Sequence, residues 1–364
     1  MFIDKEIGIR ALYGGLLLGG GGGGSFSGGM EILNTLSELN QITLHNIDNI
    51  NENSIIVTAS LVGSPASNNK FVGIYHYMKV YENLIKLYDK KISGIITNEI
   101  GAQTITNGWI LSAMTGIPII DAPCNGRAHP TGAMGSMGLS CIKEYNSLQV
   151  CAGGKGQNEI ELSVSSTIER SSGAVRNASI LAGGFVTVLR NPVTAKYVKN
   201  NAAIGGLSYA IKLGDIIYKN IGNLYNIING LIDASNMDVI CTGRICDLSL
   251  ITRDGFDVGD FNIDSGKKKY NITFWNEYMT AESDNERLAT FPELIAIFDQ
   301  ETALPITSAE IKNNMKVILT KLPIDKIILG KGMSDLALFK QAEKVINKDL
   351  IKYSFEARSE DGKN

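Results

Sequence analysis

The sequence lacks a dense basic cluster and a long apolar run. Its 364 residues contain 34 Lys and Arg against 37 Asp and Glu, and the formal net charge is −3. Because nucleic-acid-binding surfaces gather Lys and Arg on one face, this balance predicts no nucleic-acid partner. No apolar stretch approaches the roughly 20 residues of a membrane-spanning helix, which predicts no membrane partner.

The chain is also poor in cysteine. Its five cysteines are scattered, at positions 124, 141, 151, 241 and 246. An odd and scattered set argues against a disulfide scaffold and favours a reducing compartment. At the N-terminus, Asp4, Lys5 and Glu6 precede a short, glycine-broken apolar stretch, which is a poor signal peptide. We therefore expect a cytoplasmic protein.

What the sequence does have is an ordinary globular composition, with 44% hydrophobic and 20% charged residues. Its length favours two domains. Residues 1–184 alternate apolar runs with helical patterns, which predicts an N-terminal α/β domain with a mostly parallel sheet. Residues 185–364 show helical patterns over 194–232 and then alternating, turn-rich runs over 238–330. We expect a C-terminal domain that is first helical and then β-rich.

A run of six glycines, residues 19–24, stands between an apolar run and a helical pattern. Ordering glycine costs more backbone entropy than ordering any other residue, so such a run indicates close approach of the backbone or positive φ. We expect its N–H groups to line a ligand site near a helix N-terminus. The alternative is a tight connection between two helices. The expected site residues here are Gly21, Gly22, Gly23, Gly24 and Ser25.

Two carboxylates follow apolar, strand-like runs. Glu99 comes shortly after residues 92–96, and Asp121 ends the run 117–121. Neighbouring parallel strands bring their C-terminal ends together, and close carboxylates push one pKa up, which gives a proton donor beside a base. We expect catalytic roles for both. The alternative is that Glu99 caps the following helix and Asp121 holds a loop.

The loop after Asp121 carries three further candidates. His129, one of three histidines, is a candidate general base. Arg127 can bind a substrate carboxylate in a bidentate manner, or form a structural salt bridge with Asp121 or Glu99. Cys124 is a candidate site group or a nucleophile with His129 as its base, although a lone loop cysteine is more often an apolar filler. Cys124, His129 and Asp121 also leave a divalent metal such as zinc open as a cofactor.

Three more polar residues complete the expected site. Asn98 precedes Glu99, and Asn107 lies about two turns into the following helix. Glu277 belongs to the β-rich part and can reach a site in a cleft between the domains. The alternative for Glu277 is a residue that keeps an edge strand soluble.

Several motifs also follow one another in a characteristic order. They are the leucine–glycine-rich stretch 18–26, Glu99-Ile100-Gly101-Ala102, Asn107, Gly116-Ile117-Pro118, Asp121, Gly126-Arg127-Ala128 with Pro130, Asn276-Glu277-Tyr278, and residues 291–295 with Asp299. In this order and spacing the chain resembles the S-methyl thiohydantoin desulfurase family, over about residues 12–332.

The resemblance implies two α/β-containing domains and a hydrolytic reaction. Water would replace the methylthio group of a hydantoin-like ring, or act on a related cyclic amide. We accordingly expect a small-molecule substrate and a homo-oligomer.

The sequence departs from the family pattern at two places. Ser25 and Phe26 stand where the family usually has aspartate and proline, and Pro123 stands where it usually has an aspartate. Two alternatives therefore stay open beside the hydrolase: a Cys- or metal-dependent amidohydrolase, and a non-catalytic ligand-binding or subunit protein of the same family.

Overall fold

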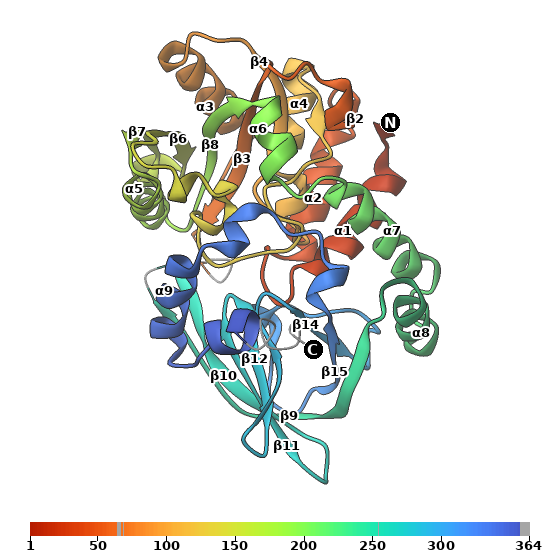
Figure 1. The fold of residues 1–364 in the computed structure, drawn as a ribbon. Helices are drawn as coiled ribbons and strands as arrows, with labels where there is room; N and C mark the ends of the chain where they lie inside the picture. The colour runs from red at the N-terminus through yellow and green to blue at the C-terminus, as the bar shows by residue number, and fades with distance from the viewer. Residues whose placement is uncertain (64–66, 68, 254, 357–364) are drawn as a thin grey trace.

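A computed structural model describes residues 1–63, 67, 69–253 and 255–356. Within these residues the strands form two sheets, one of eight strands and one of seven. Figure 1 shows the eight-stranded sheet among helices in the upper part of the molecule and the seven-stranded sheet below it. The expected α/β class with two parts is confirmed.

The eight-stranded sheet has the order β1-β2-β5-β4-β3-β8-β6-β7. Its strands are β1 (Phe2–Ile3), β2 (Ile42–His45), β3 (Ile55–Gly63), β4 (Ile92–Thr97), β5 (Ile119–Ile120), β6 (Ser147–Gly153), β7 (Ile160–Ser166) and β8 (Phe185–Thr194). The pairs β2–β5, β5–β4 and β4–β3 are parallel. The flanking pairs are antiparallel. The expected parallel arrangement therefore describes the β2-β5-β4-β3 part of this sheet.

Helices cover both faces of the eight-stranded sheet. The helices of the described chain are α1 (Lys5–Leu18), α2 (Phe26–Leu36), α3 (Ile74–Leu87), α4 (Trp109–Thr115), α5 (Ile168–Leu181), α6 (Ala195–Asn201), α7 (Gly206–Lys219), α8 (Leu224–Ser235) and α9 (Leu336–Ile346). Val57 packs in the core cluster that contains Trp109 of α4, whereas Ile56 packs in the cluster that contains Val198 of α6. Successive residues of a strand point to opposite faces, so a strand buried on both faces reads as an unbroken apolar run.

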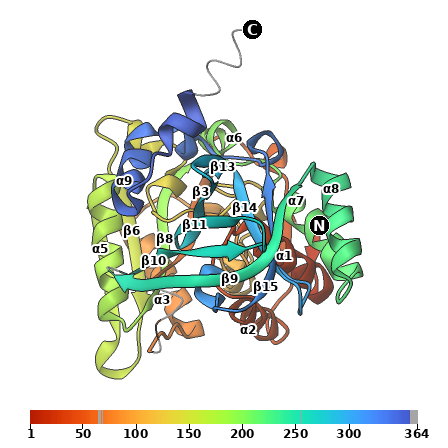
Figure 2. The same cartoon turned by 90° about the horizontal axis from the view of Figure 1, so that it is seen from below.

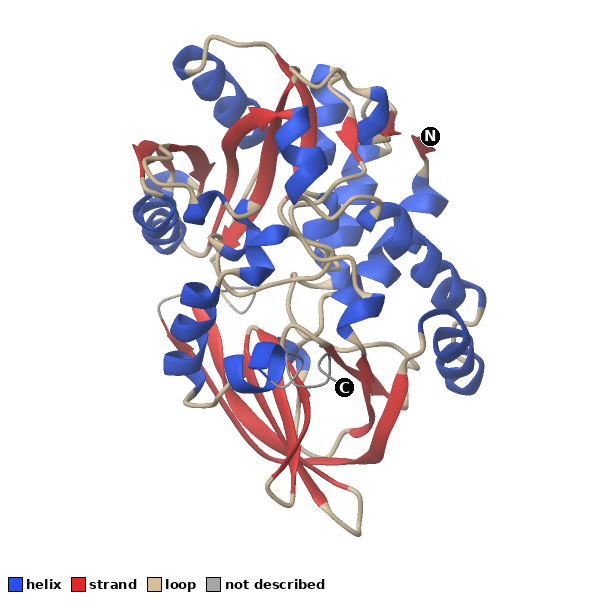
Figure 3. Ribbon diagram, viewed as in Figure 1, coloured by secondary structure: helices blue, strands red, loops and turns tan. Residues whose placement is uncertain are grey.

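The seven-stranded sheet is antiparallel throughout and has the order β13-β12-β11-β10-β9-β15-β14. Its strands are β9 (Asp238–Arg253), β10 (Phe256–Asp264), β11 (Lys269–Trp275), β12 (Glu277–Ser283), β13 (Glu286–Thr290), β14 (Leu294–Asp299) and β15 (Lys316–Leu322). Figure 3 shows it as a strongly curved sheet. Phe261, Phe274 and Tyr278 are fully buried in its core, which explains the turn-rich, alternating pattern of this region.

The two parts of the chain share elements. The expected boundary at residue 184 falls just before β8, and β8 pairs with β3 and β6 inside the first sheet. Helix α7 packs along α1, so the helical stretch after β8 also joins the N-terminal part. In the view of Figure 2, α7 and α8 lie on one side of the molecule and α5 on the other, with the long β9 between them.

Close packing of α1 on α7 depends on glycine. A Cβ at Gly14 would lie 1.8 Å from the carbonyl oxygen of Ala210, and one at Gly214 would lie 1.7 Å from that of Arg10. Backbone can approach backbone this closely only where no side chain intervenes. None of the helices in the described part of the chain is long and apolar enough to span a membrane.

Candidate active site

A cavity of about 320 Å³ lies between the two sheets. The N-terminal part supplies residues 21–24 of the glycine loop (residues 19–24), the end of β3, Asn98 and Glu99 after β4, and residues 129–132. The C-terminal part supplies β12, the segment 307–310 and Asp257 of β10. Of the predicted site residues, those that line this cavity are Gly21, Gly22, Gly23, Gly24, Ser25, Asn98, Glu99, His129 and Glu277.

The glycine loop is held from both sides. The N–H of Tyr278 donates to the carbonyl of Gly20 at 2.7 Å, and that of Ser308 donates to Gly21 at 2.8 Å. On the other side, Gly23 accepts from the N–H groups of Gln103 and Thr104, at 3.0 and 3.1 Å. The loop therefore forms a wall that links the two sheets across the cavity.

Glycine is required in this loop by conformation and by space. Gly20, Gly21, Gly23 and Gly24 have positive φ, between 53° and 95°. A Cβ at Gly22 would lie 1.9 Å from Oε1 of Glu277. The run thus lets a carboxyl group from the second sheet lie against the backbone of the first domain.

Ser25 ends the loop as the N-cap of α2, and its hydroxyl accepts from the N–H of Gly28 at 3.1 Å. Aspartate and serine are both favoured at N-caps. The serine that stands in place of the family's aspartate therefore supplies the cap.

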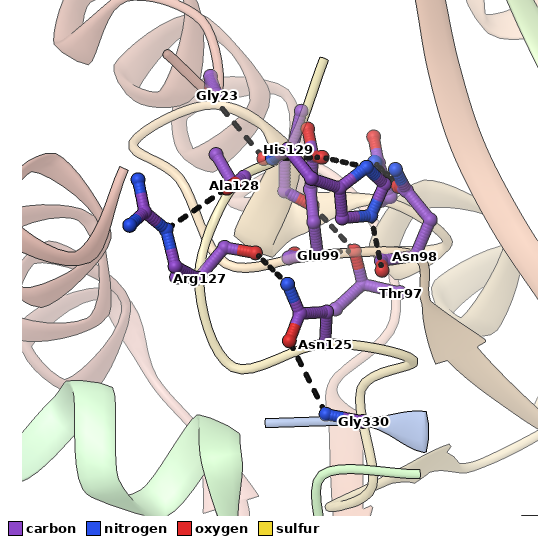
Figure 4. A network of polar contacts seen from close by, with 11 residues as sticks. Gly23, Thr97, Asn98, Glu99, Asn125, Arg127, Ala128, His129 and Gly330 are labelled. Atoms are coloured by element: carbon purple, nitrogen blue, oxygen red, sulfur yellow. Dashed lines mark hydrogen bonds and ion pairs between the residues drawn. The ribbon is translucent and has the colours of Figure 1, made fainter. Parts of the chain in front are cut away.

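Glu99 and His129 form one polar group at the end of β4 (Figure 4). Oε2 of Glu99 accepts from the main-chain N–H of His129 at 3.2 Å and lies 3.4 Å from Nδ1 of its ring. Burial lowers the pKa of His129, although the charge of Glu99 opposes that effect. The His129 imidazole is therefore uncharged at pH 7, and the main-chain N–H of His129 orients the Glu99 side chain.

Glu277 faces the same cavity from β12. It is 2% exposed, and its Oε2 has no hydrogen-bond partner among the described residues. Burial, and then the charge of Glu99, raise the pKa of Glu277 well above its ordinary value, while Arg127 opposes the shift. Two carboxyl groups from different parts of the chain thus line one cavity, and the raised pKa of Glu277 favours its protonated form.

The expected pairing of Glu99 with Asp121 is not what the structure shows. Oδ1 of Asp121 accepts from the N–H groups of Leu207 and Ser208, at 2.9 and 3.3 Å, and its Oδ2 accepts from the Ser208 hydroxyl. Asp121 thereby caps the start of α7 and does not line the cavity. Asp121 follows β5, a strand of two residues that lies between β4 and β2 in the sheet. After β5 the chain leaves the sheet, and the Asp121 side chain contacts α7.

Three other predicted residues do not line the cavity and lie behind its wall: Arg127, Asn107 and Cys124. Arg127 is fully buried and donates to the carbonyls of Ala128, Pro292 and Glu293, so it holds backbone and forms neither of the expected salt bridges. Nδ2 of Asn107 donates to Oδ1 of Asn98 at 2.8 Å and fixes that cavity residue.

Cys124 is buried against Thr58, with 3.3 Å between Sγ and Oγ1. Burial raises the pKa of its thiol to about 11, which leaves it uncharged at neutral pH. Among the described residues, no three His, Cys, Asp or Glu side chains are arranged to hold a metal ion.

Sequence reasoning missed the positive side of the cavity. Lys70, Arg176 of α5 and Arg190 of β8 line it, and Arg176 and Arg190 make no ion pair with any carboxylate of the described chain. Arg190 directly follows the apolar run 186–189, so a polar residue at the end of a predicted strand was an available signal. Nothing in the helical pattern around Arg176 marks it.

Two family models match the chain, the S-Me-THD-like N-terminal domain over residues 10–162 and the S-Me-THD-like C-terminal domain over residues 166–334. The chain belongs to the S-Me-THD-like family. This is the S-methyl thiohydantoin desulfurase family that the motif order indicated. The cavity is lined by residues of both matched domains.

A crystal structure of a protein from Chromobacterium violaceum has the same fold, with a TM-score of 0.70 and 16% sequence identity. The match covers 94% of this chain and 96% of that chain. At this identity the likeness concerns the fold alone. No curated protein matches the chain in sequence.

Proposed function

We propose that this member of the S-Me-THD-like family is a hydrolase that replaces the methylthio group of an S-methyl thiohydantoin with water. The observation that carries the proposal is that the buried side chain of Glu277, whose pKa is raised by burial and by the charge of Glu99, faces the same cavity as the Glu99 side chain. Hydrolysis of a thioimidate requires a base to activate water and an acid to protonate the ring, and this pair supplies both.

In the proposed reaction, Glu99 takes a proton from water as its oxygen attacks the ring carbon that bears sulfur. Glu277 gives its proton to the adjacent ring nitrogen. The C–S bond then breaks, the new hydroxyl oxygen becomes the hydantoin carbonyl, and its proton returns to Glu277. The proton on Glu99 leaves with the thiolate as methanethiol, so atoms balance and both carboxyl groups are restored.

The test is release of methanethiol and formation of hydantoin from S-methyl thiohydantoins with neutral and acidic ring substituents. In Glu277→Gln the amide keeps the shape of the neutral acid but supplies no acidic proton. We expect kcat to fall by about 10²- to 10⁴-fold, the usual contribution of general acid catalysis.

The matched control is Glu282→Gln, on the same strand. Glu282 pairs with Arg287 and Lys348, away from the cavity. Its loss removes a partly exposed ion pair and should leave kcat unchanged. Full activity of Glu277→Gln, or absence of methanethiol with every substrate, would contradict the proposal.

A further inference from the structure

Arg190 is a buried cation without a hydrogen-bond or ion-pair partner among the described residues. Its side chain projects from β8, between β3 and β6, and the residue is 2% exposed. No hydrogen bond or ion pair joins its guanidinium to another of the described residues, and its Nε is buried without a partner. A Cβ at Gly132, on the cavity wall, would lie 2.5 Å from its Nη1, so the guanidinium reaches the cavity.

Arg176 brings a second guanidinium to this wall. Its Nη1 donates to the carbonyls of Gly63 and Gly255, both at 3.2 Å, and its Cζ lies 4.3 Å from the ring centroid of Phe256. Burial, and then the charge of Arg190, lower the pKa of Arg176 to about 10. The two arginines are therefore close enough to repel each other, and both remain charged at neutral pH.

Lys70 is the third cation here, with Nζ 5.4 Å from the ring centroid of Phe185. We call Lys70, Arg176 and Arg190 the basic wall. The acids Glu99 and Glu277 line the same cavity, and the charge of Glu99 raises the pKa of both arginines against the larger effect of burial, but neither acid forms an ion pair with Arg176 or Arg190 within the described chain.

Burial of a charge that has no ion-pair partner costs several kcal/mol, and arginine cannot escape that cost by losing its proton. A bound anion would offset the cost. The guanidinium fork matches the two oxygens of a carboxylate or phosphate. A cavity of about 320 Å³ has room for a five-membered ring and a short acidic arm.

We propose that the basic wall binds an oxyanion, a carboxylate or a phosphate, that the substrate itself carries at a distance from its reacting ring carbon. The identity of the ring rests on the proposed function. The anion assignment rests on Arg190 and Arg176. It replaces Arg127 as the expected anchor of a substrate carboxylate, because Arg127 donates to backbone carbonyls.

The test is direct binding to the full-length protein, measured by calorimetry with hydantoin, hydantoin-5-acetic acid, glutarate and inorganic phosphate. We expect the acid to bind at least about tenfold more tightly than hydantoin, since a buried bidentate contact is worth more than 1.4 kcal/mol. In Arg190→Gln this preference should disappear while the affinity for hydantoin stays unchanged. Arg170→Gln, an exposed change on α5 with the same loss of charge, should keep the preference.

The comparison of acid with neutral ring in the native protein needs no variant, so it stays decisive if Arg190→Gln fails to fold. Equal affinities would overturn the anion site and leave the proposed function standing. Glutarate or phosphate that binds in an Arg190-dependent manner, with no binding of either hydantoin, would support the anion site and count against the proposed function. Phosphate binding with no preference for the acid would overturn the claim that the substrate carries the anion.

Discussion

At the scale of single residues, Glu277 shows how a fold holds an acid in its neutral form. The carboxyl group is buried, lies against the backbone of Gly22 and shares a cavity with the charge of Glu99. Burial and the nearby charge of Glu99 both disfavour a second negative charge. Glu99 keeps a main-chain donor from His129, whereas Oε2 of Glu277 has no donor among the described residues. The missing donor to Oε2 acts in the same direction as the effects that raise the pKa of Glu277.

The raised pKa of Glu277 predicts a stability that depends on pH. Above its ordinary pKa of 4.5, the unfolded chain loses this proton while the folded chain keeps it. The native protein therefore loses about 1.4 kcal/mol of unfolding free energy per pH unit relative to Glu277→Gln, until the folded pKa is reached. Urea unfolding of both proteins between pH 5 and 8 measures this difference.

A parallel pH dependence of the two proteins would show that Glu277 is ionised in the folded state. The control is Glu282→Gln, because its ion pairs lower the pKa of Glu282, with burial acting against them. Glu282 contributes stability that is present above its ordinary pKa and is lost as pH falls through the folded pKa. The difference in unfolding free energy between Glu282→Gln and the native protein should thus stay constant above pH 5.

Residue types could be predicted as functional more easily than their partners. The sequence predicted Glu99, His129 and the glycine loop as site residues, and all of them line the cavity. Asp121 was expected to join them because it follows a strand. In the structure the start of α7 lies beside Asp121, and N–H groups of α7 donate to its carboxyl group. That contact joins residues more than 80 positions apart, and no local pattern reports it.

At the scale of elements, the contact between α1 and α7 brings the helices after β8 onto the N-terminal part. Gly14 and Gly214 make this contact possible, since either Cβ would meet backbone of the other helix within 2 Å. The glycine loop that follows α1 is thus a second segment where the absence of a side chain permits a close contact between distant parts of the chain.

Two glycine-to-alanine changes should have opposite effects on stability. Gly214→Ala puts a Cβ 1.7 Å from the carbonyl oxygen of Arg10, and we expect a loss of about 1–3 kcal/mol from overpacking. Gly173→Ala lies in α5 with nothing within 4 Å of the added Cβ, and we expect a gain of about 0.5–1 kcal/mol from helix propensity. Urea unfolding measures both.

Each variant is the control for the other, because both replace glycine by alanine and each lies in a helix of 14 residues, α7 or α5. Changes of the same sign would show that propensity alone governs these positions. In that case the close approach of α1 and α7 would not be a constraint on the fold.

Element type was predictable where periodicity was strong. The apolar spacing over residues 74–87 predicts a helix, and α3 covers these residues. Asp4 stands before the apolar spacing of Ile7, Leu12 and Leu16, which predicts an N-cap, and it caps α1. By contrast, the runs 239–243 and 246–253 read as two strands and form one, β9. Arg244 and Ile245 between them continue the same strand, which pairs with β10 and β15 on its two sides, so tertiary pairing joins the two runs.

At the scale of the whole molecule, the proposed reaction requires the two parts of the chain to keep a fixed position relative to each other. Glu99 comes from the first sheet and Glu277 from the second, with the glycine loop between them. The sequence could suggest a cleft site for Glu277, but it could not show which surfaces meet, because those contacts span more than 100 residues.

Arg127 joins these two parts of the chain. Its fork reaches from the loop after β5 to the carbonyls of Pro292 and Glu293, just before β14, and its Cζ lies 4.5 Å from the ring centroid of Phe291. Lysine has one nitrogen and no planar fork, so Arg127→Lys leaves buried carbonyls without donors. We expect a loss of about 2–3 kcal/mol in unfolding free energy, and a lower kcat because the two carboxyl groups lose their alignment.

Arg244→Lys is the control, because Arg244 also donates to a backbone carbonyl, that of Asn314, but at an exposed position. It should change stability by less than about 0.5 kcal/mol. Urea unfolding and hydrogen exchange of residues 291–295 measure the effect. Unchanged stability of Arg127→Lys, together with weaker binding of acidic ligands alone, would instead make Arg127 the substrate anchor that its place in the sequence first suggested, and would remove that role from Arg190.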